Sequence, residues 1–130
     1  MIPTFTRAYE ASAAIEPHRI VRFSDASASQ KIATATANDQ PTIGVSDRMG
    51  GKAGGMVDVD RGGLVSVQFG EAVQAGDPLT SDDEGKAVKA VPTAGKTVRV
   101  IGYADQPAAE DEIGDMFFAP GVIHLPAGGG

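Results

Sequence analysis

"MVDVDRGGLVSVQF", residues 56–69, alternates apolar and polar side chains on both sides of an Arg-Gly-Gly break. Val57 and Val59 point to one face, because successive side chains of a strand point to opposite faces. The run after the glycines repeats the alternation with Val65 and Val67. This stretch therefore predicts two half-buried β-strands.

Similar short runs recur about every ten residues, with Gly, Pro, Asp and Asn between them. They are residues 18–23, 30–36, 42–46, 86–91, 98–104, 115–119 and 122–125. This spacing is typical of an antiparallel β-sandwich or β-barrel. Only "RAYEASAAIE", residues 7–16, has the character of a helix, so the sequence predicts an all-β fold with little helix.

Composition excludes several classes of function. The 130 residues match the length of one domain, and the absence of cysteine excludes disulfides, thiolate metal sites and a cysteine nucleophile. The net charge of −6 disfavours nucleic acid and anionic membranes as partners. No apolar run approaches the ~18 residues of a membrane span.

The acidic stretch "GDPLTSDDEGKAVKA", residues 76–90, raises the question of a metal site. A calcium loop needs alternating oxygen ligands, then a glycine, then a glutamate six residues later. Asp82 and Asp83 are instead consecutive, and Val91 stands six positions beyond Gly85. We therefore expect a wet turn between two strands, with Gly85 supplying a positive φ.

Other chemical signatures are equally weak. His18 and His124 have no second ligand at a metal spacing, the G-x-S-x-G pattern of hydrolases is absent, and "GGKAGG" is no phosphate loop. We expect no catalytic, cofactor-binding or metal residues, no cofactor and no enzyme activity. Phe117 and Phe118 are adjacent, so either one enters the core while the other faces a partner, or both are covered within the fold.

Four ordered segments carry a resemblance to a known family. They are "HRIVRFSD" (18–25), "TIGVSD" (42–47), the stretch from "GGMVDVD" to "KAVKA" (54–90) and "VRVIGYADQPAAEDEIGDMFFAPG" (98–121). In this order they resemble the capsid cement, or head decoration, proteins of tailed bacteriophages. The likeness covers roughly residues 14–123, and "GDPLTSDDEGKAV" and "IGYA" followed by "DMFFAPG" are its most specific parts.

The resemblance implies a structural virion protein with no catalytic motif. Such proteins look like compact antiparallel β-barrels or sandwiches, jelly-roll-like or β-tulip-like, and work as homodimers or homotrimers. They decorate the outer surface of an icosahedral head and clamp neighbouring major capsid protein subunits of the expanded shell. This implies synthesis in the host cytoplasm and a final place on the virion.

Two segments are candidates for contact with the capsid. Met1, Ile2, Pro3, Thr4 and Phe5 fit an extended N-terminal arm that lies across capsid subunits, the alternative being a frayed terminus. Arg48, Met49 and Lys52 of the "DRMGGKAGG" loop offer cationic and apolar contacts, the alternative being a solvated hairpin.

We expect residues 1–13 to form the arm, 14–125 a single all-β domain and 126–130 a flexible Gly-rich tail. Two other classes of function remain open. A biotinyl or lipoyl carrier domain needs a lysine at the tip of a tight hairpin, a setting that Lys52 and Lys86 lack. A phage tail or receptor-binding, sugar-binding β module would bind glycans, whereas a cement protein would sediment with heads.

Overall fold

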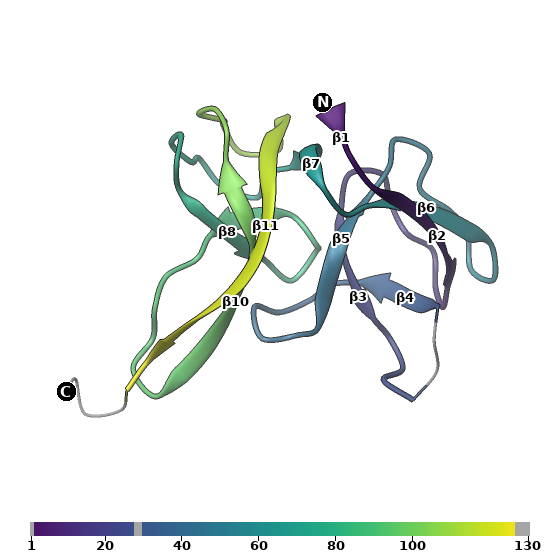
Figure 1. Cartoon of the computed structure of the whole chain (residues 1–130), viewed down its shortest axis with the longest axis horizontal. Helices are drawn as coiled ribbons and strands as arrows, with labels where there is room; N and C mark the ends of the chain where they lie inside the picture. Colours follow the sequence, from purple (N-terminus) through teal and green to yellow (C-terminus); the bar gives the residue numbers. More distant parts are fainter. Residues whose placement is uncertain (1, 28–29, 127–130) are drawn as a thin grey trace.

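A computed structural model describes residues 2–27 and 30–126, and within them every regular element is a β-strand. The strands form a five-stranded closed barrel and a six-stranded sheet that lie side by side (Figure 1). They are β1 (Ile2–Pro3), β2 (Thr6–Ala11), β3 (Ile20–Phe23), β4 (Lys31–Thr34), β5 (Thr42–Ser46), β6 (Met56–Asp60), β7 (Gly63–Gln68), β8 (Pro78–Ser81), β9 (Ala87–Lys89), β10 (Lys96–Ala104) and β11 (Ile113–Leu125). The all-β prediction is confirmed. The described part of the chain contains no apolar helix of membrane-spanning length.

The barrel has the strand order β2-β4-β3-β5-β6 and closes where β6 pairs with β2. Its pairs are antiparallel except β2 with β4, which is parallel. Val57 and Val59 of β6 are fully buried in its interior, as their alternation predicts, whereas Asp58 is exposed.

The helix expected at residues 7–16 is wrong, because Thr6–Ala11 is strand β2. Tyr9 and Ala11 are buried two positions apart, which is the period of a strand, and Tyr9 lies opposite Val57. The pairing with β6 outweighs the helix propensity of the alanines. Of the expected arm, residues 1–13, the barrel strand β2 takes in residues 6–11, while residues 2–5 precede it and residues 12–13 follow it.

The sheet has the order β1-β7-β11-β10-β8-β9. β11 is one strand of 13 residues and replaces the two expected at 115–119 and 122–125. Between Val100 and Gly102 of β10, the partners on β11 change from Gly121 to Phe118, so β11 holds one extra residue. A β-bulge of this kind tolerates a proline, which explains how the strand continues through Pro120.

Barrel and sheet share one apolar core. Ile20 and Val45 of the barrel belong to the same buried cluster as Phe69, Leu79 and Met116. Hydrogen bonds reinforce this junction: the Gln68 amide donates to the His18 carbonyl at 2.9 Å, and the Ile20 amide donates to the Gly85 carbonyl at 2.7 Å. The shared core joins barrel and sheet into one body.

Candidate functional site

The outer face of the six-stranded sheet carries a row of apolar side chains on five strands. Ile2 lies opposite Leu64, Leu64 opposite Phe117, Phe117 opposite Tyr103, and Tyr103 opposite Pro78. Residues directly opposite each other on paired strands share a face, so these five form one row, here called the apolar row.

The apolar row is open to solvent. The exposed fractions are 67% for Ile2, 53% for Phe117 and 44% for Tyr103, while Leu64 and Pro78 are half-buried. A contiguous apolar patch that a folded protein leaves exposed marks an interaction site, because a partner that covers it removes that apolar surface from water. The row is therefore the main candidate contact surface.

The side chains of Phe117 and Phe118 lie on opposite faces of β11, as one of the two sequence hypotheses requires. Phe118 is half-buried and packs against the main core, whereas more than half of Phe117 is exposed. The prediction that one ring enters the core is confirmed, and the alternative that both are covered is wrong. The inward ring holds β11 in place while the outward ring belongs to the apolar row.

The N-terminal residues complete the row at its edge. The Thr4 amide donates to the Gly62 carbonyl at 3.0 Å, and the Arg61 amide donates to the Phe5 carbonyl at 2.7 Å. Gly63 permits this approach, because its φ is +77° and a Cβ there would collide with the Ile2 carbonyl oxygen. The backbone of Ile2 and Phe5 is thus held by the chain itself while their side chains stay exposed.

Of the five residues named as the arm, Met1 lies outside the described residues. Pro3 lies in β1, and Thr4 joins β1 to Phe5. Whether residues 2–5 reach a neighbouring subunit stays a prediction. Because they pair with their own chain, an arm that crossed to a neighbour would first have to leave β7.

The loop with Arg48, Met49 and Lys52 joins the antiparallel strands β5 and β6. The Asp47 carboxylate accepts a hydrogen bond from the Met49 amide at 2.9 Å, and Met49 is 77% exposed. Lys52 lies beside Ala11, since the Gly54 amide donates to the Ala11 carbonyl at 2.8 Å and the Gly55 amide to the Lys52 carbonyl at 2.9 Å. Ile2 of the apolar row and Phe5, three positions on, precede the other end of β2. At the rise of a strand, Phe5 is roughly 17–20 Å away from Ala11. The structure does not bring Lys52 and the apolar row together.

The acidic stretch forms the expected turn. The Asp82 carboxylate accepts hydrogen bonds from the amides of Glu84 at 2.8 Å and Lys86 at 2.9 Å, and Gly85 has a φ of +76°. The turn joins β8 to β9, where Ser81 lies opposite Ala87. The described residues contain no group of three or more acidic, His or Cys side chains placed to hold a metal ion.

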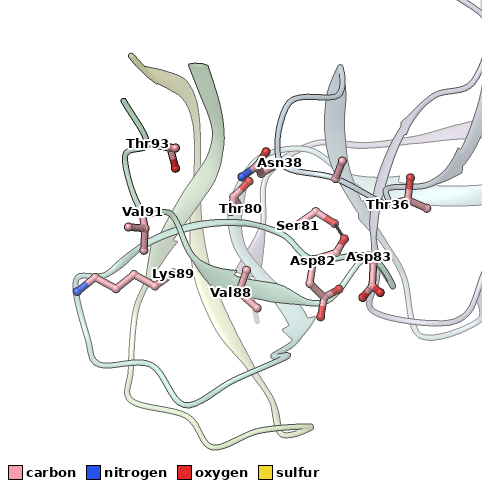
Figure 2. A pocket seen from close by; sticks show the side chains of 11 residues that line it. Thr36, Asn38, Thr80, Ser81, Asp82, Asp83, Val88, Lys89, Val91 and Thr93 are labelled. Atoms are coloured by element: carbon pink, nitrogen blue, oxygen red, sulfur yellow. Dashed lines mark hydrogen bonds between the residues drawn. The ribbon is translucent and has the colours of Figure 1, made fainter. Parts of the chain in front are cut away.

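A hollow of about 480 Å³ lies beside this turn (Figure 2). Hydroxyl, amide and carboxylate groups contribute to its lining, among them Thr36, Asn38, Thr80, Ser81 and Asp82. Figure 2 shows Lys89 on the opposite side of the hollow from Asp82. None of the lining residues is aromatic, so the hollow offers no ring on which a sugar or base could stack.

Three titratable side chains, in the barrel, at the junction and on β11, have structural partners. Burial raises the pKa of the Asp60 carboxyl, and the hydrogen bond from Thr6 Oγ1 to Asp60 Oδ1 at 2.8 Å opposes this only in part. His18 Nδ1 lies 3.2 Å from the Ser66 carbonyl oxygen, and His124 Nδ1 lies 2.9 Å from Thr97 Oγ1. These contacts tie strands together.

Sequence reasoning named Ile2 and Phe117 but missed Leu64, Tyr103 and Pro78. Their proximity depends on the register of five strands, which no local pattern reveals. The available signal was Tyr103 itself, an aromatic residue in a strand whose neighbour Ala104 faces the core. One exposed apolar residue is ordinary on a folded protein, so Tyr103 becomes informative only beside the other members of the row.

Comparisons with known proteins bear on fold and family. The family model described as "Phage cement protein" matches residues 3–116. Among solved structures, the chain is similar to the N base of the head fiber protein gp8.5 of bacteriophage phi29, with a TM-score of 0.64 and 21% identity. That match covers 88% of this chain and 93% of the other, and at this identity it shows the fold alone. No curated protein matches the chain.

Proposed function

Because the chain belongs to the phage cement protein family, we propose that the apolar row is the surface with which it binds the major capsid protein of a phage head. Its role is structural and capsid-decorating, and its place is the virion capsid. The row is the observation that carries the proposal. It offers a continuous contact surface on an otherwise acidic molecule.

The composition of the row suits an interface core. None of its five members is charged, and two are aromatic, as in the centres of protein interfaces. Ile2, Phe117 and Tyr103 each keep about half of their surface open, so covering them would contribute roughly 1 kcal/mol each. Pro78 and Leu64 add smaller areas that exclude water around the rings.

The clamping action follows from differential binding. A ligand that binds one shell state better than another shifts the balance toward that state. When the free concentration of the binding protein is 100 times its dissociation constant, binding stabilises each site by about 2.7 kcal/mol. A homodimer or homotrimer on the outer surface, with one row from each copy, would bridge neighbouring subunits of the expanded shell.

The test compares two equally exposed apolar side chains. Phe117→Ser removes a ring from the row, whereas Met56→Ser changes a side chain on β6 of the barrel, 59% exposed and opposite Glu10. Co-sedimentation with expanded heads that lack this protein measures the affinity. We expect Phe117→Ser to weaken binding by about fivefold to thirtyfold, the lower figure following from the exposed area of the ring and the upper one from an aromatic hot spot, and Met56→Ser to leave it unchanged. Equal binding by wild type and Phe117→Ser would contradict the proposal.

A further inference from the structure

β10 and β11 continue beyond the rest of the sheet as a two-stranded ribbon. Lys96–Val100 pairs with Gly121–Leu125, whereas β7 pairs with β11 only at Ile113–Phe117 and β8 pairs with β10 only at Gly102 and Tyr103. Figure 1 shows this part, here called the distal ribbon, extending away from the body toward the C-terminal end of the chain. Its β11 half lies beyond residue 116, where the family match ends.

One edge of the distal ribbon is open. The Arg99 amide donates to the Asn38 carbonyl at 2.7 Å and therefore points away from β11. In an antiparallel pair, the residue opposite such an amide also turns its own N–H and C=O outward. Val122 lies opposite Arg99, so Val122 and, two positions on, His124 present backbone donors and acceptors along the outer edge of β11.

Nothing in the described chain occupies this edge. No strand between residues 2–27 and 30–126 pairs with the outer side of β11 after Phe117. The Leu125 carbonyl is used on the inner side, where it accepts a hydrogen bond from the Gly95 amide at 2.7 Å, and this agrees with an outward His124. An open strand edge is a template for an added strand.

The charge around the edge is one-sided. Four of the eleven Lys and Arg residues, and none of the seventeen Asp and Glu residues, lie between Lys86 and Ala104, and no acidic residue follows Asp115. Lys86 and Lys89 form ion pairs with Asp111 and Asp77. Lys96 and Arg99 on the ribbon itself are exposed and form no ion pair with a described residue.

We propose that the open edge of the distal ribbon binds an extended acidic segment of a capsid subunit as an added β-strand. This rests on the proposed function and assigns it a second contact, separate from the apolar row. The outward amides and carbonyls of Val122 and His124 fit an extended chain. Lys96 and Arg99 lie on the neighbouring strand β10, on opposite faces of the ribbon, and attract acidic side chains on either face of that chain. Val122, 63% exposed, offers the added strand an apolar contact.

A second copy of the ribbon is a poorer occupant. Lys96 and Arg99 lie on β10, one strand in from the open edge, and a second copy paired through β11 would bring them no acidic side chain, because none lies within residues 87–104 or after Asp115. An acidic segment at the same edge would instead be attracted by the basic side chains of the ribbon. Charge thus selects between the two occupants that the backbone geometry alone would accept.

The test blocks the edge without touching the ribbon's own ladder. Val122→Pro removes an outward N–H and places a ring in the path of an added strand, whereas Val122→Thr keeps the donor and serves as the matched control. Heads purified without this protein are the probe, and co-sedimentation gives the affinity. We expect Val122→Pro to weaken binding at least tenfold, with Val122→Thr equal to wild type.

The double variant Lys96→Glu/Arg99→Glu tests the charge and decides the matter if Val122→Pro fails to fold. It is expected to bind at least tenfold more weakly, with a smaller dependence on salt concentration than wild type. Wild-type affinity in either folded variant overturns the proposal. The proposal is also overturned if Val122→Pro changes the oligomeric mass of the free protein while head binding stays unchanged. That result would mean that the edge joins two copies of this chain.

The variant Phe117→Ser separates this inference from the proposed function. Loss of binding in Phe117→Ser with retention in Val122→Pro overturns the added strand alone. The reverse result overturns the apolar row and supports the open edge.

Discussion

The barrel and the sheet solve the problem of strand edges in opposite ways. The barrel closes where β6 pairs with β2, so none of its strands ends the array. The sheet stays open, with the two-residue β1 at one end and a β11 that outruns β7. The closed part therefore leaves no strand edge exposed, whereas the open part leaves an apolar face and a free backbone edge exposed.

The largest expected effect tests the closed part. Tyr9→Ala leaves a cavity in the barrel interior and removes the hydroxyl to which Arg61 Nη1 donates at 2.7 Å. We expect the free energy of unfolding to fall by about 3–5 kcal/mol. Urea unfolding measures it, and Phe117→Ser on the outer sheet face should change it by only about 1 kcal/mol, the worth of its cross-strand pairs. Equal losses would mean that the apolar row belongs to the folding core.

A middle-sized effect is expected where barrel and sheet meet at the N-terminus. Gly63→Ala would set a Cβ against the Ile2 carbonyl oxygen at a φ of +77° and displace β1. Gly54→Ala is the matched control, because its φ is +79° but no atom lies within 4 Å of the new Cβ. The control should cost about 1 kcal/mol for the positive φ alone, and Gly63→Ala about 1–2 kcal/mol more.

Hydrogen exchange and head binding sharpen this second comparison. The Thr4 amide, which donates to Gly62, should exchange faster in Gly63→Ala but not in Gly54→Ala. Head binding should weaken with it, because Ile2 leaves the row. If β1 detaches and binding is kept or rises, the arm would work as a free segment instead of as a fixed edge.

The smallest effect concerns pH. Burial raises the pKa of Asp60 above its ordinary 3.8, so the folded chain takes up this proton at higher pH than the unfolded chain. The stability that Asp60 contributes is fully present below pH 3.8 and is lost as the pH rises through the raised value. Asp60→Asn should therefore gain stability relative to wild type as the pH rises above 3.8.

Urea unfolding at several pH values measures that gain, and Asp39→Asn, at an exposed carboxylate in the loop before β5, is the control. The Asp60 side chain is also subject to the charges of Asp47 and Asp58, which raise its pKa, and of His18, which lowers it. A difference between Asp60→Asn and wild type that does not vary with pH would show that the carboxyl is not perturbed in the folded protein.

The local sequence pattern was sufficient to predict where strands lie but not which strands pair with one another. Residues 42–46 and 56–60 were predicted with the bounds that the structure has, because alternation is a property of the segment itself. Residues 7–16 failed, because Tyr9 is placed by a strand 48 positions away. The split at Pro120 failed because a bulge absorbed the proline.

The contact surface shows the same division. That one of Phe117 and Phe118 faces outward could be predicted from their adjacency. That Phe117 meets Leu64 and Tyr103 could not, because register across β7, β11 and β10 is set by long-range packing. The open edge at Val122 is still further from local pattern, since it depends on where a neighbouring strand stops.

The position of β11 sets the order in which the molecule can be completed during translation. All five barrel strands lie within residues 6–60, whereas β11, the last of the described strands in chain order, sits between β7 and β10 in the middle of the sheet. The barrel can thus form on the ribosome while β7 and β10 still wait for their common neighbour. A chain cut short before residue 113 would lack the centre of its sheet, so only a chain that includes β11 can complete the apolar row and the open edge.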